Sequence, residues 1–404
     1  MLSKESILLA SKFDVKNNIP NKKLHSFYKE MYDTFCDACD YIQKLKNNKY
    51  LVSNTQIINN KNEIPKPEDF ASIYFPRIIQ EYIDEKTNYV VSYNLNIFDR
   101  EIIIHFVLDS KKYMKKLNKY VEIMVMWLYF VNMYSLKKCS KILNVYLYFT
   151  PFKKTLPEEP LDDIEPIHVN SAYTYCCRKD SAIVIFRKEE WFKVFIHETM
   201  HNFGLDFCDI QNKKIKTIMK TIFPIKSKML MYESYCEFWA TIMNSLVISF
   251  LNNTKTGNIE KDLTNFKENA NHMINIERNF SLYQMSKILA QMGLSYDELY
   301  GTHEEDKLKR AYLYKESTNT FSYYVVKTIL LFYYNDFITW CEKNNIGSFI
   351  TFKRTEKNIE LFCKFIKDKY NKKLLNDAIK NINYTSYGKD EFVIHTTRMS
   401  LFDF

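Results

Sequence analysis

A five-residue pattern near the middle of the chain constrains the fold more than any other feature. The letters HETMH occupy residues 197–201, inside an apolar segment that spans residues 191–204. If this segment is helical, His197 and His201 lie on one face of the helix, about one turn apart. Their imidazoles can then bind one metal ion, and Glu198 can reach a water in an open coordination position. Because such a short pattern also arises by chance, the rest of the chain has to support this interpretation.

The composition is that of a folded protein without an evident nucleic-acid surface. The chain has 404 residues, of which 46% are hydrophobic and 26% are charged, so it can bury a full core and form more than one subdomain. The net charge is +9, but the lysines are scattered rather than gathered with aromatic residues. We therefore expect no specific nucleic-acid partner.

The cysteines and the apolar stretches predict a cytoplasmic protein. The chain has nine cysteines, and its first residues lack the cleavage pattern of a secretory signal peptide. Reduced thiols are therefore expected, and a lone Cys36-x-x-Cys39 pair is weak evidence for a metal or redox site. The longest apolar stretch, residues 121–134, is too short to span a bilayer. The abundance of Asn, Lys, Ile and Tyr is typical of an AT-rich genome such as that of a giant DNA virus, in which case the host cytoplasm or the virion is expected.

Hydrophobic periodicity predicts an α+β fold with a mixed sheet. Alternating apolar residues predict a hairpin over residues 88–108, and helical spacing predicts a long helix over 111–136. Three further strands and the HETMH helix follow, with Gly204 as the residue that ends the helix. The strands are expected at 142–149, 168–175 and 181–187.

Helices are expected in the rest of the chain. Residues 1–85 are predicted to be a mostly helical extension, with a helix at 22–46 and loops at 54–67. Residues 86–207 then form the mixed-sheet subdomain, and residues 208–404 form a helical subdomain. The helices expected there are 229–251, 260–274, 283–292, 319–343, 355–369 and 373–382.

A third metal ligand has to come from outside the pentapeptide. A histidine six positions after His201 would complete a three-histidine site, but that position is Phe207. A downstream helix instead offers Glu233 and Glu237, four residues apart on a face of small or polar residues. Carboxylates in an otherwise apolar helix are costly to bury unless they are paired or bind a metal. The residues alone leave the choice between the two acids open, along with a solvated acidic stripe.

HExxH followed by a glutamate on a second helix resembles the gluzincin, or thermolysin-like, class of zinc metallopeptidases. The resemblance covers residues 88–250 and implies a zincin-like fold, with zinc bound by His197, His201 and Glu233. It also implies that Glu237 orients one of the histidines. However, Glu237-x-x-Ala240 is itself similar to the ligand motif of gluzincin aminopeptidases, so Glu237 stays the alternative ligand.

A second, shorter resemblance lies upstream of the HETMH helix. Residues 169–173 are similar to the edge strand with which gluzincins pair the substrate backbone. The resemblance implies that Asn170 and Ala172 contact the substrate. An ordinary edge strand or loop is the alternative.

These features together predict a zinc metallopeptidase that hydrolyses a peptide or protein, with Glu198 as the general base. A second donor to the oxyanion is expected from the C-terminal half, with Tyr235, Tyr323, Tyr324 and His395 as candidates. The alternative is a catalytically inactive protein of the same fold, with a structural or host-interaction role in a virion. The sequence does not predict the oligomeric state.

Overall fold

A six-stranded mixed sheet forms one side of the protein in a computed structural model, which describes residues 2–13, 24–210, 213–382 and 390–404. The strand order is β1-β2-β3-β4-β6-β5. Strands β3, β4 and β6 are parallel, whereas β1, β2 and β5 run antiparallel to their neighbours. The strands are β1 (Ser53–Ile57), β2 (Tyr89–Ile97), β3 (Arg100–Leu108), β4 (Ile142–Tyr148), β5 (Ala172–Thr174) and β6 (Asp180–Ile185).

The two faces of the sheet are covered by different helices. Helix α4 (Leu117–Tyr134) and helix α6 (Trp191–Asn202) contribute to the large core on one face. Helix α3 (Arg77–Lys86) contributes to a smaller cluster on the other face, with Val107 and Val184 of the sheet. Because successive side chains of a strand point to opposite faces, the apolar strands can supply both clusters.

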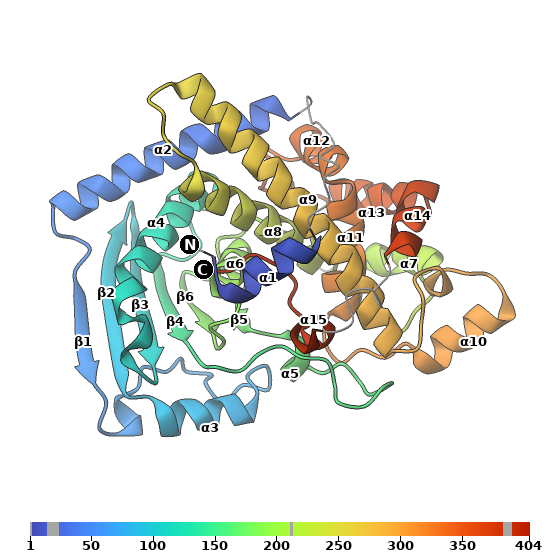
Figure 1. Cartoon of the computed structure of the whole chain (residues 1–404), viewed down its shortest axis with the longest axis horizontal. Coiled ribbons are helices and arrows are strands. Elements are labelled where there is room, and N and C mark those ends of the chain that lie inside the picture. Colours follow the sequence, from blue (N-terminus) through green and yellow to red (C-terminus); the bar gives the residue numbers. More distant parts are fainter. Residues whose placement is uncertain (1, 14–23, 211–212, 383–389) are drawn as a thin grey trace.

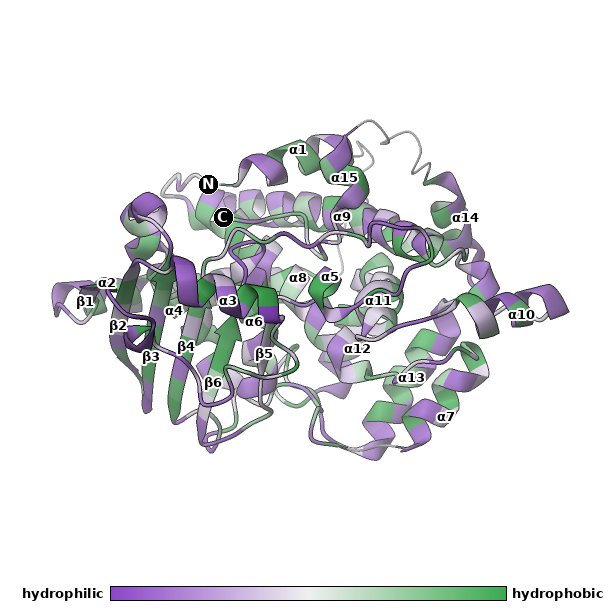
Figure 2. Ribbon diagram, turned by 90° about the horizontal axis from the view of Figure 1, so that it is seen from below, coloured by the Kyte–Doolittle hydropathy of each residue, from purple (hydrophilic) through white to green (hydrophobic). Residues whose placement is uncertain are grey.

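The remainder of the chain is mostly helical and lies beside the sheet (Figure 1). Helix α8 (Met231–Asn252) packs against α6, and helix α9 (Ile259–Gln291) packs against α8. Figure 2 shows that β6 is hydrophobic over most of its length, whereas α7 alternates between apolar and polar residues. The other α-helices are α1 (Lys4–Phe13), α2 (His25–Asn47), α5 (Pro166–Val169), α7 (Lys213–Ile222), α10 (Glu304–Leu313), α11 (Lys327–Phe332), α12 (Tyr334–Asn344), α13 (Glu356–Lys369), α14 (Lys373–Asn381) and α15 (Glu391–His395). Residues Phe321–Val326 form a π-helix, η4, directly before α11.

The predicted α+β class is confirmed, with the mixed sheet in the N-terminal half and helices after it. The predicted hairpin is β2 and β3, and the predicted strands at 142–149 and 181–187 are β4 and β6. The three-part division of the chain stays a prediction. Helix α2 packs against α4, α8 and α9, and β1 pairs with β2, so residues from the first part contact both others.

Several predicted elements are wrong in extent or type. The loop at 54–67 contains β1, whose five polar or exposed residues give no alternation because it is an edge strand. The strand at 168–175 begins as α5, where Pro166 occupies the first helical turn. The helices at 260–274 and 283–292 are one helix, α9, because buried polar residues such as Asn275 and Glu277 interrupt its apolar pattern.

The remaining differences concern helix ends and connections. The predicted helix over 111–136 starts as a 3₁₀-helix at 111–116 before α4 begins. Helix α7 lies in the connection between α6 and α8, where no helix was predicted. The predicted helix at 319–343 is divided into η4, α11 and α12. Residues 22 and 23 of the first predicted helix and residues 211 and 212 of the predicted helical subdomain lie outside the described residues.

Two disulfides correct the expectation that the cysteines are reduced. Cys139 is bonded to Cys177, and Cys176 is bonded to Cys208. The adjacent Cys176 and Cys177 thus tie the β5–β6 connection to the segment before β4 and to the segment after α6. Disulfides are typical of oxidising compartments, whereas the cytoplasmic location was predicted from the N-terminal sequence and stays a prediction.

No helix in the described part of the chain is both long enough and apolar enough to cross a membrane. This agrees with the expectation that the longest apolar stretch does not span a bilayer.

Arg187 holds the chain that leads into β5. Its guanidinium donates hydrogen bonds to the carbonyl oxygens of Asn170 (3.0 Å), Lys153 (2.8 Å) and Ile167 (2.5 Å). The side chain is 1% exposed, and burial lowers the pKa of Arg187 to about 10. Three backbone carbonyls from two segments therefore depend on one buried side chain.

We expect Arg187→Met to lower the free energy of unfolding by about 3 kcal/mol or more, because it leaves buried carbonyl oxygens without donors. Denaturant titration measures this loss. Arg77→Met, at an arginine whose side chain is 89% exposed, is the control and should change stability by about 0.5 kcal/mol or less. Equal stability of the two variants would contradict the role of Arg187.

Candidate metal centre

Helix α6 presents the two histidines on one buried face. Every residue of α6 is buried, and the helix ends before Gly204, whose φ of +72° suits a residue without a Cβ. Elsewhere on the helix, the indole N–H of Trp127 in α4 donates to the Thr199 hydroxyl at 2.6 Å. The helix is thus fixed against α4 while His197 and His201 point toward α8.

Helix α8 brings the carboxylates to these histidines. Its side toward α6 includes Cys236, whose Sγ lies 3.6 Å from His201 Nδ1. The Glu233 side chain is 12% exposed and that of Glu237 is 1% exposed. The alternative of a solvated acidic stripe is therefore wrong.

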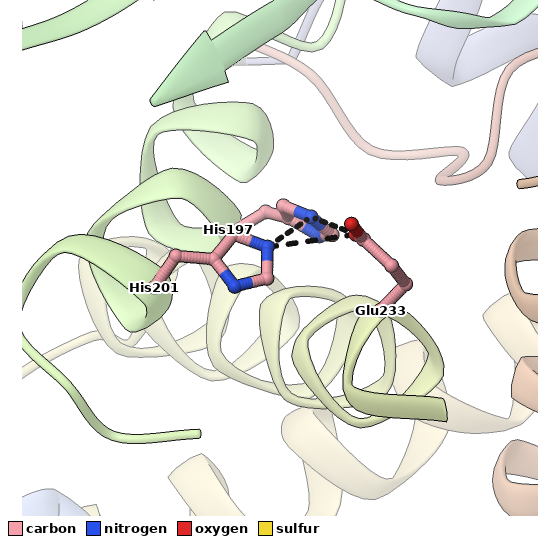
Figure 3. Close-up of side chains that lie close together, drawn as sticks. All are labelled: His197, His201 and Glu233. Carbon is pink, nitrogen blue, oxygen red and sulfur yellow. Dashed lines mark hydrogen bonds and ion pairs between the residues drawn. The ribbon is translucent and has the colours of Figure 1, made fainter. Parts of the chain in front are cut away.

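Three ligand atoms from α6 and α8 converge on one point (Figure 3). Glu233 Oε2 lies 3.2 Å from His197 Nε2 and 3.5 Å from His201 Nε2, and the two Nε2 atoms are 3.2 Å apart. Tetrahedral ligands at roughly 2.0–2.1 Å from zinc are separated from one another by roughly 3.3 Å. His197, His201 and Glu233 form a buried cluster that could hold a metal ion.

The other nitrogen of each imidazole faces a carboxylate. His197 Nδ1 lies 3.0 Å from Glu237 Oε2, and His201 Nδ1 lies 2.6 Å from Asp206 Oδ2. When each Nδ1–H donates to its carboxylate, both Nε2 atoms carry lone pairs that face each other and the Glu233 oxygen. Three acceptors at these distances repel one another unless a cation lies between them, so the donor set fits a metal ion.

The pKa values of the two acids Glu198 and Glu233 are shifted in opposite directions. Burial raises the pKa of Glu198, although the nearby His197 and His201 oppose this shift. Burial alone would also raise the pKa of Glu233, but its contacts with the two histidines hold that pKa well below its usual range. Glu233 is therefore ionised, as a carboxylate ligand has to be.

Glu198 lies at the wall of a cavity beside this cluster. The cavity has a volume of about 60 Å³ and is also lined by His197, Glu237 and Tyr323. Among the described residues, no hydrogen-bond partner fixes the Glu198 carboxylate. A base at this position is free to contact a small molecule that enters the cavity.

The predicted substrate-contacting segment borders the same cavity. Asn170, Ser171 and Ala172 contribute to its lining. Ala172 begins β5, which is the last strand of the sheet and, among the described strands, pairs with β6 alone. The side-chain oxygen of Asn170, however, accepts a hydrogen bond from the Thr318 hydroxyl at 2.8 Å.

The structure separates the four candidates for the second oxyanion donor. The Tyr323 hydroxyl lies 3.1 Å from Glu233 Oε2, and its residue lines the cavity. Tyr235 and Tyr324 instead donate to the carbonyl oxygens of Ile350 and Thr397. Neither they nor His395 belongs to the residues that line the cavity.

Asp206, Lys154, Lys193 and Met399 are site residues that sequence reasoning did not assign. Lys154, Lys193 and Met399 line the cavity, and Lys193 forms a buried ion pair with Glu237. The position of Asp206, five residues after the second histidine, was a signal that could have identified it. Lys154 and Met399 come from distant parts of the chain, and nothing in their local sequence marks them.

A second set of metal-binding side chains overlaps this centre. His201, Asp206 and Cys208 also lie close enough to share an ion. Cys208 is bonded to Cys176, so its sulfur is not a thiolate, the form that binds metals. Asp206 is thus left as a partner of His201.

Comparisons of this chain with models of protein families, with curated proteins and with solved structures found no match. The function proposed below therefore depends on the geometry and chemistry of the chain's own residues.

Asp206→Asn should weaken zinc binding by about 10–100-fold, because an amide orients His201 less firmly and makes it a poorer ligand. Competition with a chromophoric chelator measures this affinity. Asp209→Asn removes a nearby carboxylate that pairs with Arg354 at the surface, and it should leave the affinity unchanged. If both variants bind zinc like the parent, Asp206 has no role in the centre.

Proposed function

We propose that this protein is a zinc-dependent metallopeptidase of the gluzincin type, with a zincin-like arrangement of the sheet and α6. The observation that supports the proposal best is the convergence of three acceptor atoms beside an unengaged glutamate. His197 Nε2, His201 Nε2 and Glu233 Oε2 lie within 3.5 Å of one another, and Glu198 lines the adjoining cavity.

Zinc fits this donor set better than a harder cation does. Two imidazoles and one carboxylate are the ligands of catalytic zinc sites that keep an open position, whereas calcium and magnesium prefer oxygen ligands. When bound, zinc would lower the pKa of a coordinated water and polarise a carbonyl group. His197, His201 and Glu233 would hold the ion, while Glu237 and Asp206 keep both imidazoles in the ligating tautomer.

The remaining steps can be assigned to the chain's own groups. Glu198 takes a proton from the attacking water and delivers it to the leaving nitrogen, and burial raises its pKa in a direction that helps it carry that proton. Tyr323 is the candidate nearest the cluster, so its hydroxyl can donate to the oxygen that develops negative charge. The open edge of β5, at Ala172, can pair with an extended peptide substrate.

A catalytically inactive protein with a structural or host-interaction role is the alternative. It has to explain why a glutamate without a hydrogen-bond partner in the described part of the chain faces the cavity directly beside the three metal-binding side chains. A general base has this requirement, whereas a structural metal site does not. The peptidase is therefore the function that the geometry supports better.

Glu198→Gln should lower peptidase activity by about 100-fold or more while zinc content stays near one ion per chain. The amide has the same shape but cannot take up the proton. Peptide cleavage and elemental analysis measure the two quantities. Glu305→Gln, at a glutamate that is 77% exposed on α10, is the matched control. A fully active Glu198→Gln variant would rule out the proposed mechanism.

The two acids of α8 can be distinguished by their effect on metal content. Glu233→Gln should abolish stable zinc binding, because it removes a ligand. Glu237→Gln should retain zinc with about 10–100-fold lower affinity, because it disturbs only the orientation of His197. Elemental analysis and chelator competition measure both effects. If Glu237→Gln abolished zinc binding and Glu233→Gln only weakened it, Glu237 would be the metal ligand and Glu233 would orient a histidine.

A further inference from the structure

Two buried lysines line the cavity beside Glu198, although the proposed hydrolysis does not require them. Lys154 is 1% exposed and Lys193 is 2% exposed, and both contribute to the cavity wall. The rest of the wall combines apolar residues such as Val169 and Met399 with polar ones, among them the acids Glu198 and Glu237. Ammonium groups are rarely buried in such surroundings unless they serve a partner.

Each lysine has only part of its hydrogen-bonding capacity in use. Lys154 pairs with Glu190, and Lys193 pairs with Glu237. An ammonium group carries three N–H donors. In the described ranges of the chain, the only further hydrogen bond of either ammonium is that of Lys193 to Met399 Sδ at 3.9 Å, although Glu189 also lies near Lys154 and accepts from its backbone N–H.

The two partner carboxylates are themselves shared with other donors. Glu190 Oε1 accepts the backbone N–H groups of Met399 (3.1 Å) and Ser400 (2.6 Å). Glu237 Oε2 faces His197 Nδ1 at 3.0 Å. Each lysine therefore has one carboxylate oxygen as the acceptor for its three N–H groups. An additional anion in the cavity would meet unused N–H donors of both lysines.

The cavity is placed so that a group inside it lies next to the residues of the proposed hydrolysis. His197, Glu198 and Tyr323 line the same space as the two lysines. Its volume of about 60 Å³ is larger than the roughly 10–15 Å³ that one water needs on this measure, so a group of a few heavy atoms can enter.

We propose that this cavity binds a carboxylate of the substrate, held by Lys154 and Lys193 beside the scissile peptide bond. The inference rests on the proposed peptidase function and specifies its substrate class. The carboxylate comes either from an acidic side chain next to the cleaved bond or from the C-terminus of a peptide. The two sources share the same chemistry, and the experiment separates them.

Peptide libraries give the first test. Synthetic peptides with Glu or Gln at each position, and with free or amidated C-termini, are incubated with the zinc-loaded protein, and the cleavage sites are identified by mass spectrometry. We expect kcat/KM to be about 10-fold or more higher for the carboxylate form of the preferred peptide than for its amide form. A preference confined to Glu identifies a side chain, and one confined to free C-termini identifies the terminal carboxylate. Equal cleavage of acid and amide forms would overturn the proposal.

The lysine can be removed together with its partner so that no charge is left unpaired. The double variant Lys154→Met, Glu190→Gln should lose most of the preference for the carboxylate, measured as the ratio of kcat/KM for the acid form to kcat/KM for the amide form. Lys307→Met, Glu304→Gln removes an exposed lysine–glutamate pair on α10 and should keep the full preference. If the double variant does not fold, Lys154→Gln alone keeps a donor toward Glu190 and tests the same loss of charge. An unchanged preference in the folded variant would overturn the proposal.

Binding gives a measurement that does not depend on hydrolysis. Calorimetry with the zinc-loaded Glu198→Gln variant compares glutarate, a dicarboxylate, with the neutral glutaramide. Glutarate should bind with an affinity at least about 10-fold higher than that of glutaramide. Adding the Lys154→Met, Glu190→Gln changes should remove this difference in affinity. Failure of all peptides to be cleaved would contradict the peptidase function, whereas glutarate binding that ignores Lys154 would contradict the carboxylate site.

Discussion

The pairing of buried polar and charged groups at and beside the interface between α6 and α8 is the constraint on which the rest of the structure depends. Glu237 contacts both Lys193 and His197, Asp206 contacts His201, and Glu190 contacts Lys154. Removing one member of such a pair leaves a buried charge uncompensated, which costs about 3–5 kcal/mol. Among these pairs, only the contacts of Glu237 cross from α8 to α6, so these contacts fix how the two helices approach each other.

The same pairs determine the orientation of the proposed metal ligands. His201, whose Nδ1 is hydrogen-bonded to Asp206, can rotate little, so its Nε2 stays directed at His197 and Glu233. The apolar residues around α6 exclude water, which strengthens the interaction of a cation with the three acceptors. Arg187 also fixes the chain before the edge strand β5, because it donates hydrogen bonds to the carbonyl oxygens of Asn170 and Lys153. Asn170 and Lys154, the residue after Lys153, both line the cavity.

Local patterns predicted the elements that are apolar on a regular period, and these include α6, β2, β3, β4 and β6. They failed for β1, whose exposed polar residues form a strand only because β2 offers an unpaired edge. In the site, helical spacing predicted the positions of His197 and His201. It did not predict Lys154 or Met399, because their place in the cavity is set by tertiary packing between segments far apart in the chain.

The cavity has a consequence for the order in which the protein becomes functional during synthesis. The three proposed metal ligands have all been translated once residue 233 is added, whereas Met399 completes the wall of the cavity. The backbone of Met399 and Ser400 also satisfies Glu190, the partner of Lys154. A growing chain on the ribosome therefore contains every metal ligand for more than a hundred residues of synthesis before it has a finished place for a substrate.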